Sequence, residues 1–397
     1  MKIEAKVEEM MMRELNGEYL SNPHNYTGPN ADLDNFEPVA NIVVIGVGGA
    51  GNNAVNRMID DDIRNVTFWV ANTDKQALAT SRARNRLVLG EEITQGLGAG
   101  GDPAVGRDAA LHSKEQLEKI VKGADLVFIA AGMGGGTGTG AAPIIADIAK
   151  RAGALTIAIV TRPFGFEGKI RTANSVEGLN NLKDVVDSII VVSNDKLLMV
   201  NGNAPISEAF SASDKVLAQS VKTVVDLILL PAVINLDYAD VRNTLKDSGI
   251  ALIGFGEGTG PNKAVEAAQN AVNSPLLEAA LTGARKAIIS VTCGKTVSLY
   301  EAQDTVYKII ETAGNDLDIK FGVSINSYLD DQILVSVIAS DFKEEYDFTA
   351  IPTVTGPIRP RVEEILTPVI NEEETTPEED ILPDFLKNII ENEDQSF

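Results

Sequence analysis

The chain has 397 residues, a formal net charge of −23 and a hydrophobic fraction of 44%, so it is long enough for two or three domains with a sizeable core. A single cysteine excludes a disulfide framework and a thiolate zinc site, and two histidines far apart in sequence argue against a His-based triad or a multi-histidine metal site. The acidic balance argues against nonspecific binding to nucleic acid or anionic lipid.

Residues 1–39 form an acidic N-terminal extension. Their start, MKIEAKVEEMMMREL, is charged throughout, so it lacks the apolar core of a secretory signal and the basic character of a transit peptide. No apolar run in the chain approaches the length that spans a bilayer. We therefore expect a cytoplasmic protein without direct membrane insertion.

Residues 40–204 alternate between strand and helix patterns. Apolar strands are predicted at 41–46, 66–72, 125–132, 155–161 and 188–193, with helical segments such as 52–60 and 141–154 between them. This alternation predicts an α/β fold, a Rossmann-like doubly wound domain with a mostly parallel sheet.

A glycine-rich loop follows the first strand. The stretch GVGGAGNNA (46–54) fits G-x-G-x-x-G as Gly46, Gly48 and Gly51, and Asp74 follows near the end of the next strand. This is a fair dinucleotide fingerprint. One alternative is therefore an NAD-dependent oxidoreductase of the Rossmann type.

A second glycine loop follows the strand at 125–132. AGMGGGTGTG (131–140) holds six glycines in ten residues and opens a helix, which makes it an anion site built from backbone N–H groups. Glycines can also serve tight turns and helix–sheet packing, but the density and the interleaved threonines favour a polyphosphate held between the two loops. The chain has no Walker A motif, because CGKT (293–296) has Ile289 where the first glycine belongs.

A long central helix is predicted over residues 205–231, with Pro231 at its end. After it, INLDYADVRNTL (234–245) places Asn235, Asp237 and Asp240 before or at the start of a helix. Helix capping is the simple explanation, but it occupies one of the three rather than all. Two carboxylates and an amide in one loop can orient a water for attack on a phosphoanhydride.

Residues 232–342 predict a second, smaller α/β domain. Strands are expected at 250–256, 286–293, 319–325 and 333–340, with helices near 262–273 and 301–314. Residues 343–376 read as a flexible linker, followed by a peptide at 377–397. From residue 343 the chain carries 15 acidic and 4 basic side chains, so a disordered acidic tail is expected.

Several stretches together resemble the bacterial cell-division GTPases of the FtsZ family, which are relatives of tubulin. They are GVGGAGNNAVNRM, NTD (72–74), GLGAGGDPAVG (96–106), AGMGGGTGTGAAP, VTRPFGFEGKIR (160–171) and NLDYAD, and the resemblance covers roughly residues 40–342. It implies the tubulin/FtsZ fold and a GTP-dependent homopolymer that forms the division ring at the inner face of the membrane. Subunits would stack head to tail, so that the loop Asn235–Asp240 enters the nucleotide site of the next subunit, a non-closing contact that generates filaments.

The resemblance also implies the site residues, with Asn235, Asp237 and Asp240 as the catalytic group. The nucleotide contacts are Gly48, Gly49, Ala50, Gly51, Asn52 and Asn53 in the first loop, Gly135, Gly136, Thr137, Gly138 and Thr139 at the phosphates, Glu167 and Arg171 near the ribose and phosphate, and Asn194, Phe210 and Asp214 at the guanine. Phe210 would stack on the base, although core packing of the long helix is its alternative role. The cofactors are GTP or GDP with Mg²⁺, which the phosphates and water hold without protein ligands.

Residues 380–388, DILPDFLKN, resemble the short peptide by which this family binds membrane tethers and division regulators. The acidic N-terminal extension is longer than usual for the family, and the acidic end IIENEDQSF departs from the basic ends of many members. A non-hydrolysing filament scaffold of the same fold is a further alternative. The presence of both Asp237 and Asp240 argues against it.

Overall fold

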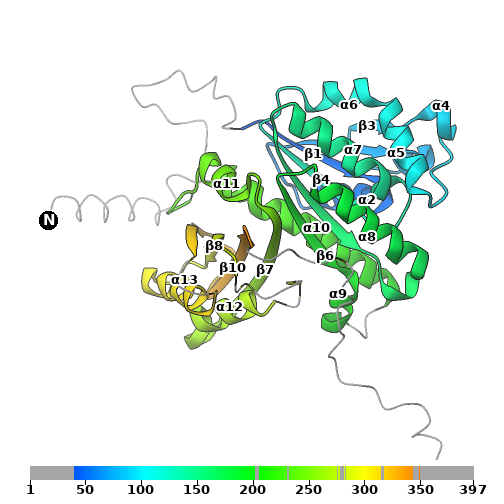
Figure 1. The fold of residues 1–397 in the computed structure, drawn as a ribbon. Coiled ribbons are helices and arrows are strands. Elements are labelled where there is room, and N and C mark those ends of the chain that lie inside the picture. The colour runs from blue at the N-terminus through cyan, green and yellow to red at the C-terminus, as the bar shows by residue number, and fades with distance from the viewer. Residues whose placement is uncertain are drawn as a thin grey trace, which may run out of the picture. The chain divides into compact units, whose positions relative to one another are not determined.

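In the computed structural model, the strands of the described part of the chain all belong to one continuous sheet (Figure 1). The structure describes residues 40–201, 205–229, 232–274, 276–277, 281, 283–313, 317–342 and 348, and not the side chains of 198–201 and 206–208. The predicted N-terminal extension, Pro231, almost all of the linker and the C-terminal peptide lie outside these residues.

Strands and helices alternate through most of the chain, and the second half forms a four-stranded extension of the sheet with helices between its strands in sequence. In chain order they are β1 (Ile42–Val47), α2 (Gly48–Asp60), β2 (Thr67–Asn72), α3 (Lys75–Ala79), β3 (Asn85–Val88), α4 (Glu91–Thr94), α5 (Pro103–His112), α6 (Lys114–Val121), β4 (Leu126–Gly132), α7 (Thr137–Arg151), β5 (Leu155–Arg162), η2 (Gly165–Glu167), α8 (Lys169–Lys183), β6 (Ser188–Ser193), α9 (Asn194–Asn201), α10 (Ile206–Leu229), α11 (Tyr238–Leu245), β7 (Gly249–Thr259), η3 (Gly260–Asn262), α12 (Lys263–Val272), β8 (Lys286–Cys293), α13 (Leu299–Ala313), β9 (Asp318–Ile325) and β10 (Gln332–Ser340).

The sheet has the order β3-β2-β1-β4-β5-β6-β7-β10-β8-β9. Strands β1 to β6 are all parallel, and β6 pairs in parallel with the first residues of β7, so the second group of strands extends the first sheet. Within that second group β10 is antiparallel to both β7 and β8. The pairing thus changes from parallel to antiparallel between β7 and β10, within the region predicted as the second α/β part.

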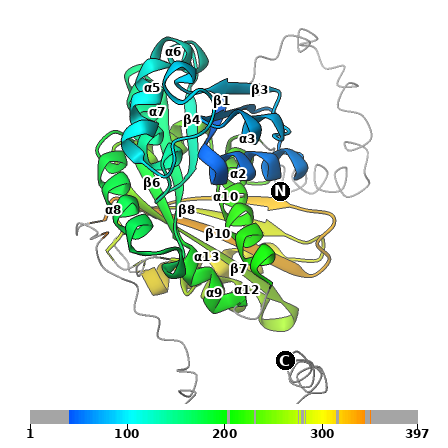
Figure 2. The ribbon, with the colours of Figure 1, turned by 90° about the vertical axis from the view of Figure 1, so that its right-hand side faces the viewer.

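Helices cover both faces of the parallel strands, which explains why these strands read as continuous apolar runs. On β1, Val44 packs into a core with α2 and α10, whereas Val43 and Ile45 pack into a second core with α5, α6, α7 and α8. A third core lies between α12, α13 and the second group of strands. Figure 2 shows α10 crossing below α2, and buried residues of α10 share one core with Ile253 and Ile338 of the second group.

The predicted strands are confirmed, with small shifts of their ends. The four-residue strand β3 was not predicted. Two predicted helices begin earlier than expected: α2 starts at Gly48 rather than residue 52, and α7 starts at Thr137 rather than residue 141. Both first turns are rich in glycine, which is a poor helix former, so local propensity hides the true start. The earlier start matters because it puts a helix N-terminus inside each glycine loop.

Candidate functional site

The two glycine loops lie at the carboxyl edge of the parallel strands. β1 and β4 are neighbours, and the chain leaves β1 toward β2 on one side and β4 toward β5 on the other. In open α/β sheets ligands bind at this point, where the strand order reverses. The two loops thus meet at the position where the architecture favours a ligand site.

The backbones of the two loops are in contact. A Cβ on Gly48, whose φ is +70°, would lie 2.9 Å from the backbone nitrogen of Gly138. A Cβ on Gly51 would lie 2.2 Å from the carbonyl oxygen of Ala130, inside β4. These glycines are required by packing, as the turn-and-packing alternative expects.

Gly49 and Gly135 are different, because the fold gives no reason for a glycine at either position. A Cβ on either would meet nothing within 4 Å, and neither residue has a φ in the left-handed region. Each residue lies at the start of a helix that opens at the carboxyl edge. Space beside two helix N-termini, kept free of side chains, suits an anion that approaches the backbone closely.

Polar side chains buried beneath the loops fix their shape. The Thr139 hydroxyl accepts a hydrogen bond from the Gly134 N–H at 2.8 Å, and the Thr137 and Thr73 hydroxyls lie 2.7 Å apart. The Asn52 side chain, 3% exposed, donates to the carbonyl oxygens of Gly46 and Gly48 when its amide is oriented to satisfy both ends. Asn52 therefore supports the first loop from below, whereas Asn53 is exposed.

A third loop, residues 96–102, completes this edge and was not assigned a site role from the sequence. A Cβ on Gly136 would lie 2.9 Å from both the backbone nitrogen and the carbonyl oxygen of Asp102, and 2.8 Å from the Ala99 methyl group. The glycine-rich composition of residues 96–101 could have indicated this role. The backbone of this third loop forms one wall beside the second glycine loop, residues 131–140.

The predicted guanine contacts lie where β6 ends and α10 begins. Asn194, 6% exposed, directly follows β6, and its Oδ1 accepts a hydrogen bond from the Ser213 hydroxyl at 2.8 Å. Phe210 is 43% exposed, so it is not a core residue, and its ring contacts Phe164 edge-on at 5.1 Å between centroids. Burial raises the pKa of Asp214 to about 6, and the positive charge of Arg57 opposes that rise.

Glu167 and Arg171 follow β5 at the same edge. They form an ion pair with each other, and Glu167 Oε1 also accepts a hydrogen bond from the Phe164 N–H at 2.9 Å. A Cβ on Gly134 would lie 2.7 Å from the Arg171 carbonyl oxygen, so the start of α8 touches the glycine loop. All the predicted nucleotide contacts therefore follow β1, β4, β5 or β6 at their carboxyl ends, or lie at the start of α10.

Asp237 and Asp240 lie at the opposite edge of the sheet. The hydroxyl of Tyr238, between them in sequence, donates a hydrogen bond to the Asp125 carbonyl oxygen at 2.7 Å. Asp125 immediately precedes β4, whereas the glycine loop follows the other end of this strand. Seven residues of strand separate the two points, roughly 20 Å at 3.3 Å per residue. The two aspartates cannot reach the glycine loops of their own chain.

The expectation that capping occupies one of the three loop residues is wrong. Asp237 Oδ1 accepts a hydrogen bond from the Asp240 N–H at 2.8 Å, and Asp240 Oδ2 accepts one from the Asp237 N–H at 3.4 Å, which forms a reciprocal capping box. Asn235 Oδ1 accepts from the Ala232 N–H at 2.6 Å. Local bonds thus hold all three residues, yet Asn235 and Asp237 stay exposed and both carboxylates keep lone pairs free.

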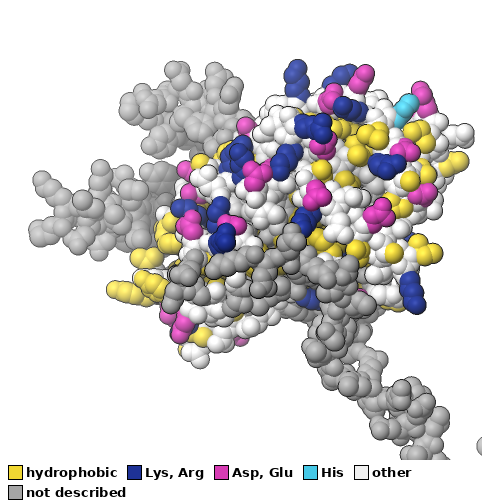
Figure 3. Space-filling model, viewed as in Figure 1, with side chains coloured by type: hydrophobic (Ala, Val, Ile, Leu, Met, Phe, Trp, Pro, Cys, Tyr) yellow, Lys and Arg dark blue, Asp and Glu magenta, His cyan; other side chains and the backbone are white. Residues whose placement is uncertain are grey.

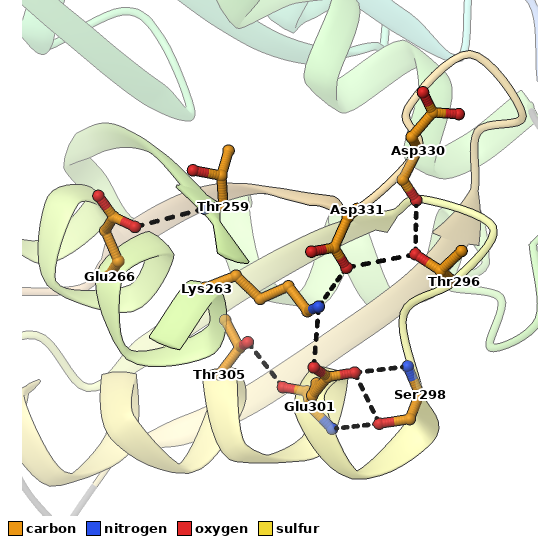
Figure 4. Close-up of polar contacts among 9 residues, drawn as sticks. All are labelled: Thr259, Lys263, Glu266, Thr296, Ser298, Glu301, Thr305, Asp330 and Asp331. Carbon is orange, nitrogen blue, oxygen red and sulfur yellow. Dashed lines mark hydrogen bonds and ion pairs between the residues drawn. The ribbon is translucent and has the colours of Figure 1, made fainter. Parts of the chain in front are cut away.

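A charged cluster in the second group of strands has a structural role (Figure 4). The Lys263 side chain, 7% exposed, forms ion pairs with Glu301 at 3.0 Å and with Asp331, so it joins α12, α13 and the β9–β10 turn. Hydrogen bonds from the Ser298 N–H and hydroxyl, followed by that from Lys263, lower the pKa of Glu301 to about 2. Among the described residues no group of three His, Cys, Asp or Glu could hold a metal ion.

Comparisons with known proteins agree with this geometry. Residues 41–202 match the GTPase domain of the tubulin/FtsZ family, and residues 249–343 match the C-terminal domain of the FtsZ family. The structure of an empty FtsZ dimer from M. jannaschii is 40% identical, with a TM-score of 0.73 over 76% of this chain and 88% of that chain. The chain belongs to the tubulin/FtsZ family. It is a GTPase that binds guanine nucleotide, which argues against the alternatives of an NAD-dependent oxidoreductase and a non-hydrolysing scaffold.

Two further structures show how widely the fold extends. A mutant FtsZ from M. jannaschii is 39% identical, with a TM-score of 0.74 over 78% of this chain and 94% of that one. CetZ2 from Haloferax volcanii, solved as a protofilament with GTPγS, is 21% identical, with a TM-score of 0.67 over 78% of this chain and 95% of that one. The second likeness concerns the fold alone.

Proposed function

We propose that this GTPase assembles head to tail into filaments and hydrolyses GTP at the contact between successive subunits. The observation that supports this most directly is the separation of the two half-sites: the open glycines Gly49 and Gly135 at one edge of the sheet and the Asp237–Asp240 pair at the other. A second copy stacked on the first would bring its aspartates to the nucleotide. A contact between unlike surfaces does not close on itself, so it produces a filament.

The proposed mechanism uses backbone N–H groups where other nucleotide enzymes use a lysine. The amides of the two helix N-termini would hold the phosphates, and Thr137 and Thr139 would keep the second loop in shape. Mg²⁺ would be held through the phosphates and water, and it would neutralise phosphate charge when bound. Asp237 and Asp240 of the neighbour would orient the attacking water and accept its proton.

Guanine recognition would fall to Phe210, Asp214 and Asn194. The exposed face of the Phe210 ring is available for stacking, and an ionised Asp214 would accept hydrogen bonds from the guanine N1–H and amino group. Glu167 and Arg171 would contact the ribose and phosphate. This arrangement rejects adenine, which offers an acceptor at N1 in place of the donor.

Exposed apolar side chains at both ends of the proposed stack support self-assembly. Near the glycine loops, Leu97 is 81% exposed and Ile170 is 79% exposed. Beside the Asn235–Asp240 loop, where the Val233 N–H donates to the carbonyl oxygen of Val323 at 2.8 Å, Ile325 is 60% and Tyr328 93% exposed. Figure 3 shows hydrophobic side chains that project at the left of the view, in the region of α13 and β8. Stacking of subunits would cover these exposed apolar groups at both ends.

The cellular role that we infer is the cytokinetic ring, in the cytoplasm at the inner face of the membrane at the division site. Among the described residues no helix has the length and the apolar character needed to cross a bilayer. A tether is therefore part of the proposal. Residues 380–388, which lie outside the described residues, are the proposed peptide for tethers and regulators. Deletion of residues 377–397 should abolish recruitment to a membrane-bound tether without a loss of GTPase activity.

The test of the shared site is the dependence of GTPase activity on protein concentration. Activity per chain should be low in dilute protein that already binds GTP, and it should rise above the concentration at which light scattering reports polymer. Activity per chain that stays constant across the whole assembly range would contradict hydrolysis between subunits.

A further inference from the structure

Helix α11 begins with the catalytic loop and is fastened to the base of the parallel strands at its first residue. The hydroxyl of Tyr238 donates to the Asp125 carbonyl oxygen at 2.7 Å and accepts a hydrogen bond from Arg242 at 3.0 Å. The same carbonyl oxygen accepts the N–H of Leu155, the first residue of β5, at 2.9 Å. The Tyr238 ring packs against the core beneath α2 and α10. The acceptor of this bond is therefore held firmly in place.

The exit of α11 is fastened to a second element of the nucleotide half. Lys150 Nζ donates to Asp247 Oδ1 at 3.1 Å and to the carbonyl oxygen of Val186 at 2.9 Å, and it lies 3.4 Å from Asp187 Oδ1. The Asp187 residue is 3% exposed, so this lysine is the counter-charge of a buried carboxylate. The bond from Lys150 lowers the pKa of Asp247.

Both fastening points belong to elements that carry the glycine loop at their other ends. β4 enters the loop after Gly132, and α7 leaves it from Thr137 and ends in the turn that holds Lys150. A strand and a helix are stiff over this length. Helix α11 follows the catalytic loop. Its start is thus attached to β4 and its end to α7, the two elements that frame the phosphate site of the same subunit.

A second set of bonds joins α11 to the antiparallel strands. The Ser340 hydroxyl donates to the Thr244 carbonyl oxygen at 2.9 Å, and Lys286 Nζ donates to the Asn243 carbonyl oxygen at 3.0 Å. These bonds hold the last turn of α11, whereas Tyr238 lies between the two aspartates in sequence. Of these side-chain bonds between α11 and other elements, that of Tyr238 is therefore the one closest in sequence to the catalytic carboxylates.

We propose that Tyr238 is a positioning residue for GTP hydrolysis: its hydroxyl, bound to the base of β4, fixes Asp237 and Asp240 for insertion into the neighbouring subunit, and the Lys150–Asp247 pair secures the other end of α11. The inference rests on the proposed function. Water activation by two carboxylates depends on their placement to within a fraction of an ångström. Loss of the hydroxyl leaves the ring and its packing in place but frees the loop to shift.

The test compares Tyr238→Phe with Ser340→Ala in the full chain. Each change removes one hydroxyl that bonds to a backbone carbonyl, the first at the base of β4 and the second at the last turn of α11. In Tyr238→Phe filaments we expect kcat to fall roughly tenfold, less than the ~100-fold that a misplacement of about 1 Å can cost, with unchanged KM, GTP affinity and sedimented polymer. Ser340→Ala should keep kcat within about twofold of the parent chain, because it leaves the anchor nearest the carboxylates intact.

A second variant tests the exit anchor. Asp247 has a φ of +49°, which asparagine tolerates, so Asp247→Asn removes the charge without backbone strain. We expect a fall in kcat of about two- to threefold, because the pair is partly exposed.

Three outcomes would overturn the inference: an unchanged kcat in Tyr238→Phe, an equal fall in Ser340→Ala, or a fall in GTP affinity in place of kcat. Asp240→Ala distinguishes a wrong role for Tyr238 from a wrong proposed function. If Asp240→Ala loses hydrolysis while Tyr238→Phe does not, the shared site is supported and the role of Tyr238 is refuted.

Discussion

The two edges of the parallel sheet carry different kinds of chemistry. At the carboxyl edge the backbone dominates: two helix N-termini and the open glycines Gly49 and Gly135 leave room for an anion. At the amino edge side chains dominate, because Asp237 and Asp240 stand at the start of α11. Phosphate binding needs close approach, whereas hydrolysis needs a positioned carboxylate. A strand separates the two groups of residues within one chain, so in the proposed mechanism assembly is a condition for catalysis.

The largest effect is expected from a change at the amino edge. Asp240→Ala should lower GTP turnover in filaments by roughly 10²–10⁴-fold, because it removes a carboxylate that positions or deprotonates the attacking water. GTP affinity should stay unchanged, since in the proposed mechanism the residue serves the nucleotide of the neighbour. Phosphate release and fluorescent GTP binding measure the two quantities.

Asp240→Asn is the control for the capping box. Its amide oxygen can still accept the Asp237 N–H, so an effect of the cap alone would leave the Asn variant active. We expect the Asn variant to lose hydrolysis as well. Loss of GTP affinity in either variant would show that the aspartate belongs to its own chain's site.

A change at the carboxyl edge should act on binding and spare the fold. Gly135→Leu places a side chain in the open space above the glycine loop, so GTP affinity should fall by about 100-fold or more, while the melting temperature stays near that of the parent. Gly51→Ala is the contrasting variant. Its methyl group would clash with the Ala130 carbonyl oxygen, so it should lower the melting temperature as well as the GTP affinity. Normal GTP affinity in Gly135→Leu would refute the assignment of this edge.

The pH dependence of binding tests the guanine contact at the carboxyl edge. Burial raises the pKa of Asp214 to about 6, and only the ionised carboxylate can accept from both the guanine N1–H and the amino group in the proposed contact. GTP affinity should therefore be constant above pH 6 and fall as the pH decreases below it, by up to about tenfold per pH unit. Asp214→Asn should bind more weakly at pH 7 and lose this dependence. Equilibrium dialysis between pH 5 and 8 measures both curves, and parallel curves for the two chains would contradict the contact.

The smallest effect is expected away from both edges, in the Lys263 cluster. The pKa of Glu301 is lowered to about 2, so its ionised form adds stability above its ordinary pKa near 4.5, and this contribution is lost as the pH falls toward 2. Glu301→Gln should lower the melting temperature at pH 7 by about 2–4 °C, and the difference should narrow below pH 4.5. The exposed pair Lys308–Glu311 supplies the control, because Glu311→Gln should change little. A difference that grows in acid would contradict this account.

Features that depend on neighbouring residues were predictable from the sequence. The strand–glycine loop–helix units and the helix after Asp237 follow from local patterns. The D-x-x-D spacing in NLDYAD resembles a capping-box sequence, so the reciprocal cap of Asp237 and Asp240 could also have been predicted. The early starts of α2 and α7 were not predictable from propensity, because glycine and threonine disfavour the helix that the tertiary fold imposes.

Features that depend on distant residues were out of reach. Gly49 and Gly51 look alike in the sequence, yet one faces open space and the other packs against β4. The bond from Tyr238 to Asp125 spans 113 positions, and that from Lys150 to Asp247 spans 97. Such contacts follow from strand order and helix packing, which no local pattern encodes. The resemblance to a family indicated which residues gather, but not which of them hold the others in place.

The most direct test of the shared site is complementation between two inactive chains. Asp240→Ala keeps its nucleotide loops and lacks the catalytic carboxylate, whereas Gly135→Leu keeps the carboxylates and lacks an open phosphate loop. Each alone should hydrolyse little GTP. An equimolar mixture should regain up to about a quarter of the parent activity, because one in four random contacts unites two intact halves. A mixture that sediments as a copolymer but hydrolyses no more GTP than its separate components would contradict a site shared between subunits.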